Sequence, residues 1–434
     1  MIYLVSNTQS LFKSEHYKTI PFEEALNLLT PLKEVQLDTE TMGLDAHTKQ
    51  LLTIQLGCKS FQVVFDWTTM SREDKLKLKI YLESGRVLIG WNLLFDLGFL
   101  YVNNIWPTNI WDGMIAEQLL YLGYSEHTYS LKAAAMHYLG YDLDKSVRGK
   151  IINNGLTEEV VIYAAGDVTF LEDIKDKQME EIVQQHMEQA LKLENAFIPS
   201  LAYFKHCGVL LDVPRWLKKM EQDLDNVKSA EKILNDWVVD WCLKNDAGYD
   251  VQYIDCWGKS KYEINQEESK LISSGYTRCV QRDAEGPGSI LHAYRKSNNW
   301  IKWDLQGDLF SETPYDTKPK CTINWKSSQQ VISLFKRLGI NTESFDKKTK
   351  ESKDTINKKL LKAQADKFPI LPIFLKYKAA VKLTTTYGQN WIDAINPATG
   401  RIHVEFHSIG TDTARVSSGG GIYKLNLQFG GIIM

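Results

Sequence analysis

The chain has 434 residues, of which 24% are charged and 44% are hydrophobic, a balance that excludes a disordered or collagen-like protein and predicts about two to four globular domains. No stretch of about 18 apolar residues is present, and the N-terminus lacks the basic and apolar regions of a signal peptide, so neither membrane insertion nor secretion is expected. The formal net charge of −3 is divided unevenly, with −10 over residues 1–190, 0 over residues 191–345 and +7 over residues 346–434.

The first elements along the chain predict an α/β layer. Three short apolar runs, Val35–Leu37, Leu51–Leu56 and Gln62–Phe65, are separated by turn-prone residues and are typical of adjacent strands in one sheet. Helical spacing follows over residues 71–84. The buried strand Arg86–Gly90 then runs directly into a second helix, Leu93–Val102. Strands alternating with helices in this way favour a sheet covered by helices.

The remaining chain is mainly helical in pattern. Helical spacing extends over residues 111–189, with Asp112 and Thr157 as expected N-caps, and a further helix stops at Gly208. A long amphipathic helix is expected over Trp216–Leu243. Between residues 245 and 319 the periodicity is lost, which indicates a small β-containing insertion. Later helices are expected over Ser327–Leu338, Thr355–Lys382 and Thr385–Ile395, and the last forty residues have turn-like and strand-like patterns.

Acidic side chains cluster in the front of the chain. Asp38 and Glu40 end the first predicted strand, and the two-residue period of a strand places both on one face. Asp96 lies on the first turn of the helix after the Arg86–Gly90 strand. Tyr163 and Asp167 are four residues apart in a helical stretch, hence on one face of that helix. Each of these patterns alone is commonly an ordinary surface feature, so their order and their placement on these elements carry the prediction.

Acids that converge in this way suit a pair of divalent ions. Two Mg²⁺ or Mn²⁺ ions about 3.5–4 Å apart activate water and stabilise the attacking and leaving oxygens of a phosphodiester. A phenol one helical turn from a ligand acid can hydrogen-bond the attacking water. The sequence therefore predicts a two-metal phosphodiesterase site.

Three motifs carry a resemblance to a known family. They are Leu-Asp-Thr-Glu-Thr-Met-Gly-Leu from residue 37, Gly-Trp-Asn-Leu-Leu-Phe-Asp from residue 90 and Tyr-Ala-Ala-Gly-Asp from residue 163. Residues 34–190 thereby resemble the tyrosine-containing DEDD-type 3′–5′ exonuclease domain of bacterial and phage family A DNA polymerases and of ribonuclease D. The resemblance implies an RNase H-like fold in which four acids hold two metal ions, Tyr163 orients water, Leu44 wedges against the terminal bases and Asn92 contacts the substrate strand. The four implied metal ligands are Asp38, Glu40, Asp96 and Asp167.

The rear half resembles the start of a family A polymerase domain. Residues 207–212 resemble its first segment, and residues 324–330 match its thumb motif Asn-x-x-Ser-x-x-Gln. Residues 411–418 and 426–428 resemble the family's T-G-R-L-S-S and P-N-L-Q segments, although Ala414 stands where the family has glycine. The basic excess of this region agrees with phosphate contacts. The DNA contacts implied by this match are Arg415, Asn426 and Gln428, with Lys378 and Lys382 near phosphates.

These observations give one expected organisation. Residues 1–190 are expected to form an RNase H-like α/β exonuclease domain, residues 191–384 a mainly helical thumb with a β-containing insertion at 245–319, and residues 385–434 the first strands of an incomplete palm. The expected partners are single-stranded and primer-template DNA. Because the palm and finger motifs are missing, the chain is expected to be either one part of a split polymerase or a truncated product. Polymerisation is expected only if a second polypeptide completes it. The insertion lies where one phage replicative polymerase recruits a processivity partner, so it is expected either to bind such a partner or to decorate the thumb and contact only DNA or nothing.

Two alternatives remain open at this point. A free-standing exoribonuclease resembling ribonuclease D shares the front motifs but gives no reason for the rear ones. A DNA-binding scaffold with an inactive nuclease is disfavoured because all five exonuclease residues are present. The six cysteines are scattered without a C-x-x-C pair, so they are expected to be reduced thiols in a cytoplasmic protein.

Overall fold

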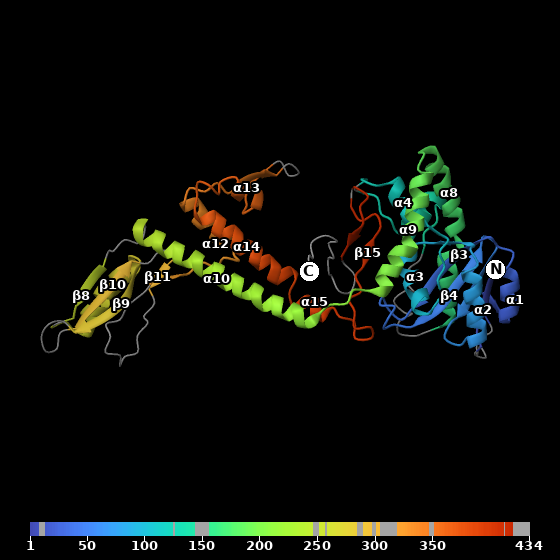
Figure 1. Ribbon diagram of the computed structural model, residues 1–434, viewed down its shortest axis with the longest axis horizontal. Coiled ribbons are helices and arrows are strands. Elements are labelled where there is room, and N and C mark those ends of the chain that lie inside the picture. The colour runs from blue at the N-terminus through green and yellow to red at the C-terminus, as the bar shows by residue number, and fades with distance from the viewer. Residues whose placement is uncertain are drawn as a thin grey trace. The chain divides into compact units, whose positions relative to one another are not determined.

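The computed structural model describes two units of the chain separately. Its described residues are 1–7, 14–124, 126–143, 156–245, 251–256, 258–283, 290–296, 301–303, 319–346, 351–411 and 413–419. One unit comprises residues 1–211 together with the segment that follows residue 389, and the other comprises residues 212–389 (Figure 1). Within the described residues, every helix is too short or too polar to cross a bilayer.

A mixed sheet organises the first unit. The strand order is β2-β1-β5-β4-β3-β6-β7. Strand β4 runs antiparallel to both β3 and β5, whereas β6 runs parallel to β3 and to β7. The predicted adjacent strands are therefore confirmed. The seven strands are β1 (Ile2–Val5), β2 (Tyr17–Thr19), β3 (Glu34–Thr41), β4 (Leu51–Cys58), β5 (Phe61–Asp66), β6 (Val87–Gly90) and β7 (Ile110–Asp112).

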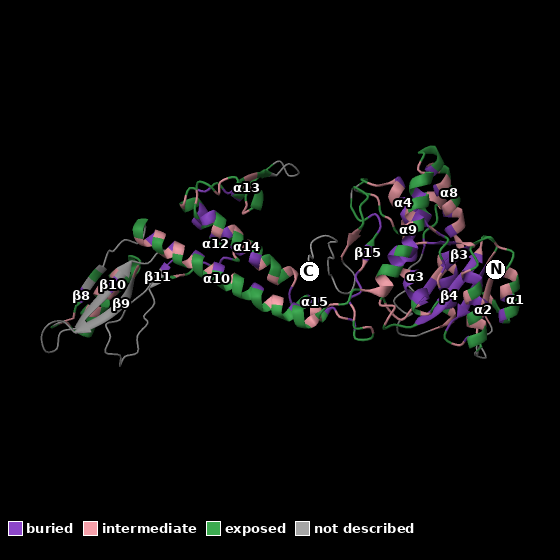
Figure 2. Ribbon diagram, in the orientation of Figure 1, coloured by how far each residue is buried: buried purple, intermediate pink, exposed green. Residues whose placement is uncertain are grey.

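Helices flank this sheet, as the sequence predicted. Figure 2 shows the buried residues concentrated in the strands and in the helices that pack on them. The helix α3 is buried along most of its length, which explains why its sequence is almost continuously apolar. The helices are α1 (Phe22–Leu29), α2 (Arg72–Leu82), α3 (Leu93–Val102), α4 (Gly113–Leu120), α5 (Leu131–Leu139), α7 (Glu158–Thr169), α8 (Leu171–Gln184) and α9 (Glu188–Cys207).

The C-terminal segment joins the first unit. Residues Val209 and Ile402 form an antiparallel bridge, and the strands β15 (Phe406–His407) and β16 (Ser417–Ser418) pair in a short hairpin. A short helix, α15 (Gln389–Asp393), precedes this hairpin. The boundary expected at residue 190 falls within α9, whose residues pack against α3. Contacts distant in sequence thus place residues 390–419 beside the sheet domain.

A helical core builds the second unit. The long helix α10 (Val213–Asn245) packs against α14 (Ile370–Thr386) and α12 (Ser328–Arg337) around Phe335 and Phe374. The helix expected over residues 355–382 is wrong as a single element. It is divided into α13 (Lys358–Lys362) and α14, because Pro369 lacks an amide donor and disfavours helical geometry at the residue before it.

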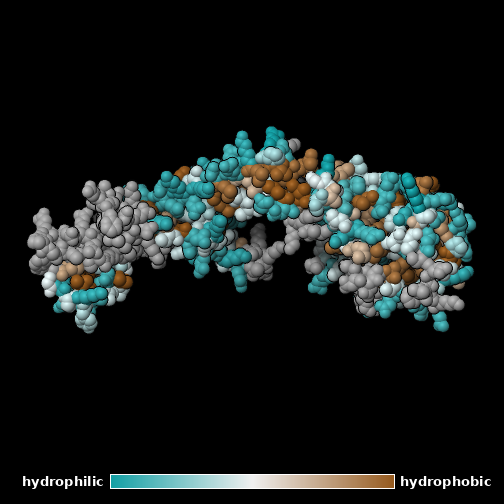
Figure 3. Space-filling view, turned by 90° about the horizontal axis from the view of Figure 1, so that it is seen from below, coloured by the Kyte–Doolittle hydropathy of each residue, from teal (hydrophilic) through white to brown (hydrophobic). Residues whose placement is uncertain are grey.

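The insertion contains strands, as predicted, and also a helix that was not predicted. Strands β8 (Val251–Asp255), β10 (Ile290–Lys296) and β9 (Tyr276–Asp283) form an antiparallel sheet in that order. The helix α11 (Lys261–Ser273) has a capping box formed by Ser260 and Glu263. It buries no residue, so its sequence has no apolar stripe to indicate a helix. Shorter pairs are β11 (Ile301–Trp303) with β12 (Pro319–Cys321) and β13 (Glu343–Asp346) with β14 (Glu351–Asp354). On the face drawn in Figure 3, hydrophobic residues gather in patches separated by hydrophilic ones.

Candidate active site

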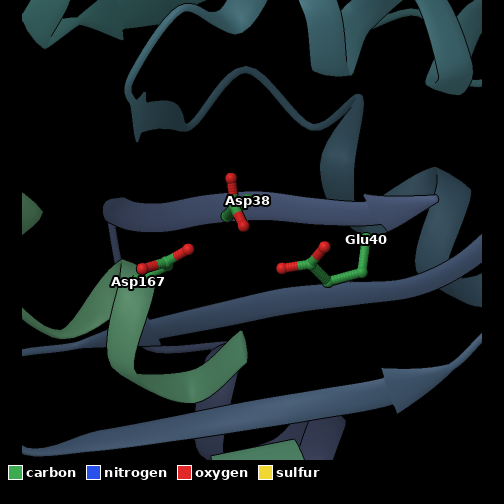
Figure 4. A group of neighbouring side chains, drawn as sticks. All are labelled: Asp38, Glu40 and Asp167. Carbon is green, nitrogen blue, oxygen red and sulfur yellow. The ribbon is translucent and has the colours of Figure 1, made fainter. Parts of the chain in front are cut away.

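Three carboxylates come together on one face of the sheet. Asp38 and Glu40 lie two residues apart on β3, and Asp167 lies on α7 (Figure 4). One oxygen of each side chain lies within 4.8 Å of an oxygen from each of the other two. Carboxylates this close repel one another, and a divalent cation with oxygen ligands relieves that repulsion. The group therefore fits a metal site, as the sequence predicted for these three residues.

Packing on the sheet fixes the position of α7. Val161 and Ala165 contact Val64 in one buried cluster, and Tyr163 contacts Leu52 in another. Thr157 caps the helix by accepting a hydrogen bond from the amide of residue 160, as predicted. Because Tyr163 lies one turn before Asp167, the phenol shares the side of α7 that carries the third acid.

Asp96 lies outside this group of three. It is buried in the first turn of α3, and its Oδ1 accepts a hydrogen bond from the Thr39 hydroxyl at 2.6 Å. Thr39 stands between Asp38 and Glu40, so this hydrogen bond ties Asp96 to the strand that carries both acids. Burial raises the pKa of Asp96 to about 7, although the Thr39 hydrogen bond acts in the other direction. The role of Asp96 as a fourth metal ligand stays a prediction.

A tight strand-to-helix turn presents the buried acid of α3. A side chain at Gly90 would meet the Leu93 side chain at 2.3 Å and the Leu37 carbonyl at 3.0 Å, so the turn needs glycine there. Asn92 has φ of 62°, a left-handed conformation that asparagine tolerates better than most residues. Part of this motif is therefore conformational. The Asp112 carboxylate closes the turn by accepting hydrogen bonds from the amides of Asn92 at 2.9 Å and Leu93 at 2.7 Å.

Asp112 does more than the sequence analysis expected of it. It was expected to cap one helix, and it does accept a hydrogen bond from the Met114 amide at 3.0 Å at the start of α4. It also holds the start of α3, and its own amide donates to Asn195 Oδ1 at 3.1 Å. Burial raises the pKa of Asp112 to about 6, partly offset by the amide donors around it. Only tertiary structure reveals that one side chain serves two helices.

Two residues to which the resemblance assigns substrate contacts are exposed, whereas the neighbouring Trp91 is used for packing. Leu44, on the loop after β3, is 64% exposed, and Asn92 is also exposed. The Trp91 indole instead donates to the Tyr129 carbonyl at 3.1 Å and packs closely over Gly113. Trp91 therefore contributes to the core where the exonuclease family usually has histidine. The contacts of Leu44 and Asn92 with a substrate stay predictions.

The two lysines of α14 lie in different surroundings. Lys382 is exposed, as a phosphate-binding side chain should be. Lys378 is half-buried, donates to the Ile356 carbonyl at 3.0 Å and lies over the Phe374 ring. Burial lowers the pKa of Lys378. Of the two, Lys382 is the one whose charge the surrounding chain leaves open to solvent.

Of the remaining rear residues, Arg415 lies just before β16 in the described part of the chain. Arg415 is exposed, and its carbonyl accepts a hydrogen bond from the Gly410 amide at 3.0 Å. Ala414 has φ of 53°, the left-handed region that favours the glycine found there in the polymerase family. Asn426 and Gln428 lie outside the described residues.

The thumb motif forms an N-terminal cap for α12. The Ser327 hydroxyl accepts a hydrogen bond from the Gln330 amide at 3.4 Å, and the Gln330 side chain accepts one from the Asn324 amide at 2.7 Å. The Asn324 side chain in turn accepts one from the Lys326 amide at 3.0 Å. The motif residues thus satisfy the backbone at the start of a helix.

Comparison with known families agrees with both halves of the sequence analysis. Residues 17–183 match the 3′–5′ exonuclease domain associated with family A DNA polymerases, and residues 309–428 match DNA polymerase family A. The first match includes the three clustered acids and Tyr163, and the second includes Lys378, Lys382 and Arg415. The chain therefore contains a 3′–5′ exonuclease domain and a partial polymerase region, and it is similar to DNA polymerase I-like proteins.

Individual relatives show the same likeness over part of their length. DNA polymerase I of Aquifex aeolicus is 31% identical over 218 residues, covering 46% of this chain and 36% of that protein. The thermostable DNA polymerase I of Thermus aquaticus is 35% identical over 85 residues, covering 20% of this chain and 10% of that protein. The chain thus spans about a third or less of these curated relatives. A solved structure of the POL domain of Pol1 from M. smegmatis, in complex with DNA primer-template and dNTP, has a TM-score of 0.59 at 15% identity. The match covers 95% of this chain and 55% of the chain in that structure.

Proposed function

We propose that this DNA polymerase I-like chain removes nucleotides from DNA 3′ ends by metal-dependent phosphodiester hydrolysis, as the proofreading part of a family A DNA polymerase. The observation that carries the proposal is the approach of Asp38, Glu40 and Asp167 to within 4.8 Å of one another on the exonuclease-like sheet. Among the described residues, no other three or more acids, histidines or cysteines bring their ligand atoms within 4.8 Å of one another.

The residues of the site divide the work. Asp38, Glu40 and Asp167 would hold two divalent cations, Mg²⁺ or Mn²⁺, with Asp96, which bonds Thr39 on the same strand, as the fourth acid. When bound, the cations lower the pKa of water and offset the charge that develops on the phosphodiester. Tyr163 orients the attacking water through its hydroxyl, which the position of Tyr163 on the Asp167 side of α7 supports. Leu44 and Asn92 contact the 3′ end, as their exposure allows.

DNA is the proposed substrate because the rear half adds a polymerase-like, basic region to the nuclease. Residues 346–434 carry a net charge of +7, and exposed lysines and arginines bind nucleic-acid phosphates. Lys382, Arg415, Asn426 and Gln428 are proposed to bind the primer-template, with Lys378 supporting the helix that carries Lys382. A ribonuclease D-like activity on RNA is the competing outcome.

The test is trimming of matched DNA and RNA oligonucleotides by the whole chain. The double variant Asp38→Ala/Asp167→Ala should lose at least ~10³-fold in rate with Mg²⁺ or Mn²⁺, because the acids act in the transition state. Glu180→Ala is the matched control, since Glu180 is an exposed acid of α8 that pairs with Lys177. Degradation of single-stranded DNA by the double variant at the parent rate would refute the site, and faster trimming of RNA than of DNA would favour ribonuclease activity.

We further propose that nucleotide addition by this protein requires a second polypeptide carrying the palm and finger motifs. Support comes from the family A match over residues 309–428, which lies beside an exonuclease match in the same chain. Mixing the chain with such a polypeptide should give primer extension and a complex by gel filtration. Absence of both would reject the idea. The insertion at 245–319 is proposed as the binding site of a processivity partner, and its deletion should shorten the products of the mixture.

A further inference from the structure

The loop that carries Leu44 is a closed structure attached directly to the acid site. Its base is closed by a hydrogen bond from the Met42 amide to the Gln50 carbonyl at 2.9 Å, and Met42 packs in the cluster that contains Tyr163. At its tip, Asp45 accepts hydrogen bonds from the His47 amide at 3.0 Å and the Thr48 hydroxyl at 2.9 Å. Asp45, the neighbour of Leu44, therefore fixes the backbone at the tip of the loop.

A residue from the far end of the chain holds this tip. Asn396 donates from its side-chain amide to Asp45 Oδ2 at 2.8 Å, over a separation of 351 residues. Asn396 is fully buried, and its own turn is fixed because its amide donates to the Arg401 carbonyl and its side-chain oxygen accepts from the Ala398 amide, at 2.8 and 2.9 Å. The donor that reaches Asp45 is thus rigid.

Imidazole rings packed at a tilt make the second attachment. The ring of His47 lies 3.9 Å from the ring of His403 and 5.2 Å from that of His206, centre to centre. His403 is fixed by hydrogen bonds to the Lys205 carbonyl and the Thr399 hydroxyl, each at 2.7 Å. Burial, followed by the two neighbouring histidines, lowers the pKa of His47 to about 4, with Asp45 acting in the opposite direction. The His47 ring is therefore packed as a neutral group at pH 7.

We propose that Asn396 and His403 are positioning residues of the exonuclease, which clasp the tip of the Leu44 loop and set how a paired or mispaired end is separated before hydrolysis. The expected effect on hydrolysis rests on the proposed exonuclease function, whereas the contacts that form the clasp do not. Because residues 390–419 resemble the start of the palm, the polymerase part of the chain would act directly on the substrate-facing loop of the nuclease.

Hydrogen–deuterium exchange of the full chain tests the clasp without any nuclease assay. Asn396→Ala should speed exchange of amides in residues 42–50 about fivefold, since a net hydrogen bond of about 1 kcal/mol is lost. Ser408→Ala is the matched control: its hydroxyl contacts Glu194, so it loosens the same segment away from the loop. Unchanged exchange in Asn396→Ala, or an equal increase in Ser408→Ala, would overturn the clasp.

A ratio of rates tests the positioning role. Asn396→Ala should lower kcat/KM on a mispaired duplex end about fivefold and leave trimming of a single-stranded oligonucleotide within about twofold. The exchange-of-partners variant Asp45→Asn/Asn396→Asp keeps a donor and an acceptor across the contact and should restore the ratio. Faster loop exchange with an unchanged ratio, or equal loss on both substrates, would overturn the positioning role. If the parent chain hydrolysed neither substrate, the proposed function would be refuted. The hydrogen–deuterium exchange experiment would still decide whether the clasp exists.

Discussion

The motifs of the front and rear halves of this chain use their polar side chains in opposite ways. In residues 38–167 the motif acids Asp38, Glu40 and Asp167 are directed toward one another, which is unfavourable unless a cation joins them. In residues 324–330 the side chains of Asn324 and Gln330 accept hydrogen bonds from backbone amides that precede α12. The front motif holds carboxylates in mutual repulsion that a bound cation would relieve. The rear motif gives hydrogen-bond acceptors to backbone amides that would otherwise be unsatisfied.

This difference separates two meanings of a family motif. The same kind of sequence match predicts a ligand in one place and a helix cap in the other, and only the direction of the side chains distinguishes them. Lys378 and Lys382 repeat the contrast within a single helix, since the first serves a carbonyl of the protein and the second faces solvent. Front-motif substitutions should therefore change activity, and rear-cap substitutions should change stability.

The largest effect expected from a single substitution is on catalysis. Tyr163→Phe should lower the rate of DNA trimming by about 10²-fold, because the variant loses the hydroxyl that orients water but keeps the ring that packs on Leu52. The midpoint of urea unfolding should stay within error of the parent. The measurement is single-turnover hydrolysis beside an unfolding curve. A variant that unfolds earlier but trims at the parent rate would place Tyr163 with the structural motifs and break the comparison.

A cap substitution should show the reverse pattern. Ser327→Ala should lower the free energy of unfolding by about 1 kcal/mol, because the Gln330 amide loses its acceptor. Trimming of single-stranded DNA should not change. Ser328→Ala, one residue later and exposed, serves as the control. If Ser327→Ala were as stable as the parent but bound DNA more weakly, the thumb motif would be a contact rather than a cap.

A glycine at residue 414 should stabilise the chain. Ala414→Gly should raise the free energy of unfolding by about 0.5–1 kcal/mol, since φ of 53° strains alanine and not glycine. Ala379→Gly, at an exposed position inside α14, should instead destabilise by about 1 kcal/mol. Chemical denaturation of both variants gives the sign. Equal destabilisation by the two changes would contradict the left-handed turn before β16.

The smallest effect is expected from a single exposed lysine. Lys382→Ala should weaken binding of primer-template DNA by about two- to threefold and reduce the salt dependence of binding by about one phosphate contact. Lys378→Ala should leave the salt dependence unchanged, because its ammonium already donates to Ile356. Fluorescence titrations at several salt concentrations measure both. Equal slopes for the two variants would remove the distinction between them.

Much of the front domain could be predicted because its signals are local. The strand endings at Asp38 and Glu40, the turn at Gly90 and the helix cap at Thr157 each depend on residues within a few positions of one another, and the structure confirms these elements. The helix α11 was missed because it buries no residue. The helix over residues 355–382 was drawn too long because its periodicity continues across Pro369.

By itself, the sequence determined which acids the chain offers, on which kinds of element they lie and which families its two halves resemble. The tertiary structure alone decided that three of the acids lie together, that Asp96 accepts a hydrogen bond from Thr39, and that Asp112 holds two helices at once. It also decided that Asn396 holds the loop of Asp45. The physical reason is separation: local backbone preferences encode strands and caps, whereas contacts between residues hundreds of positions apart form only when the whole core packs.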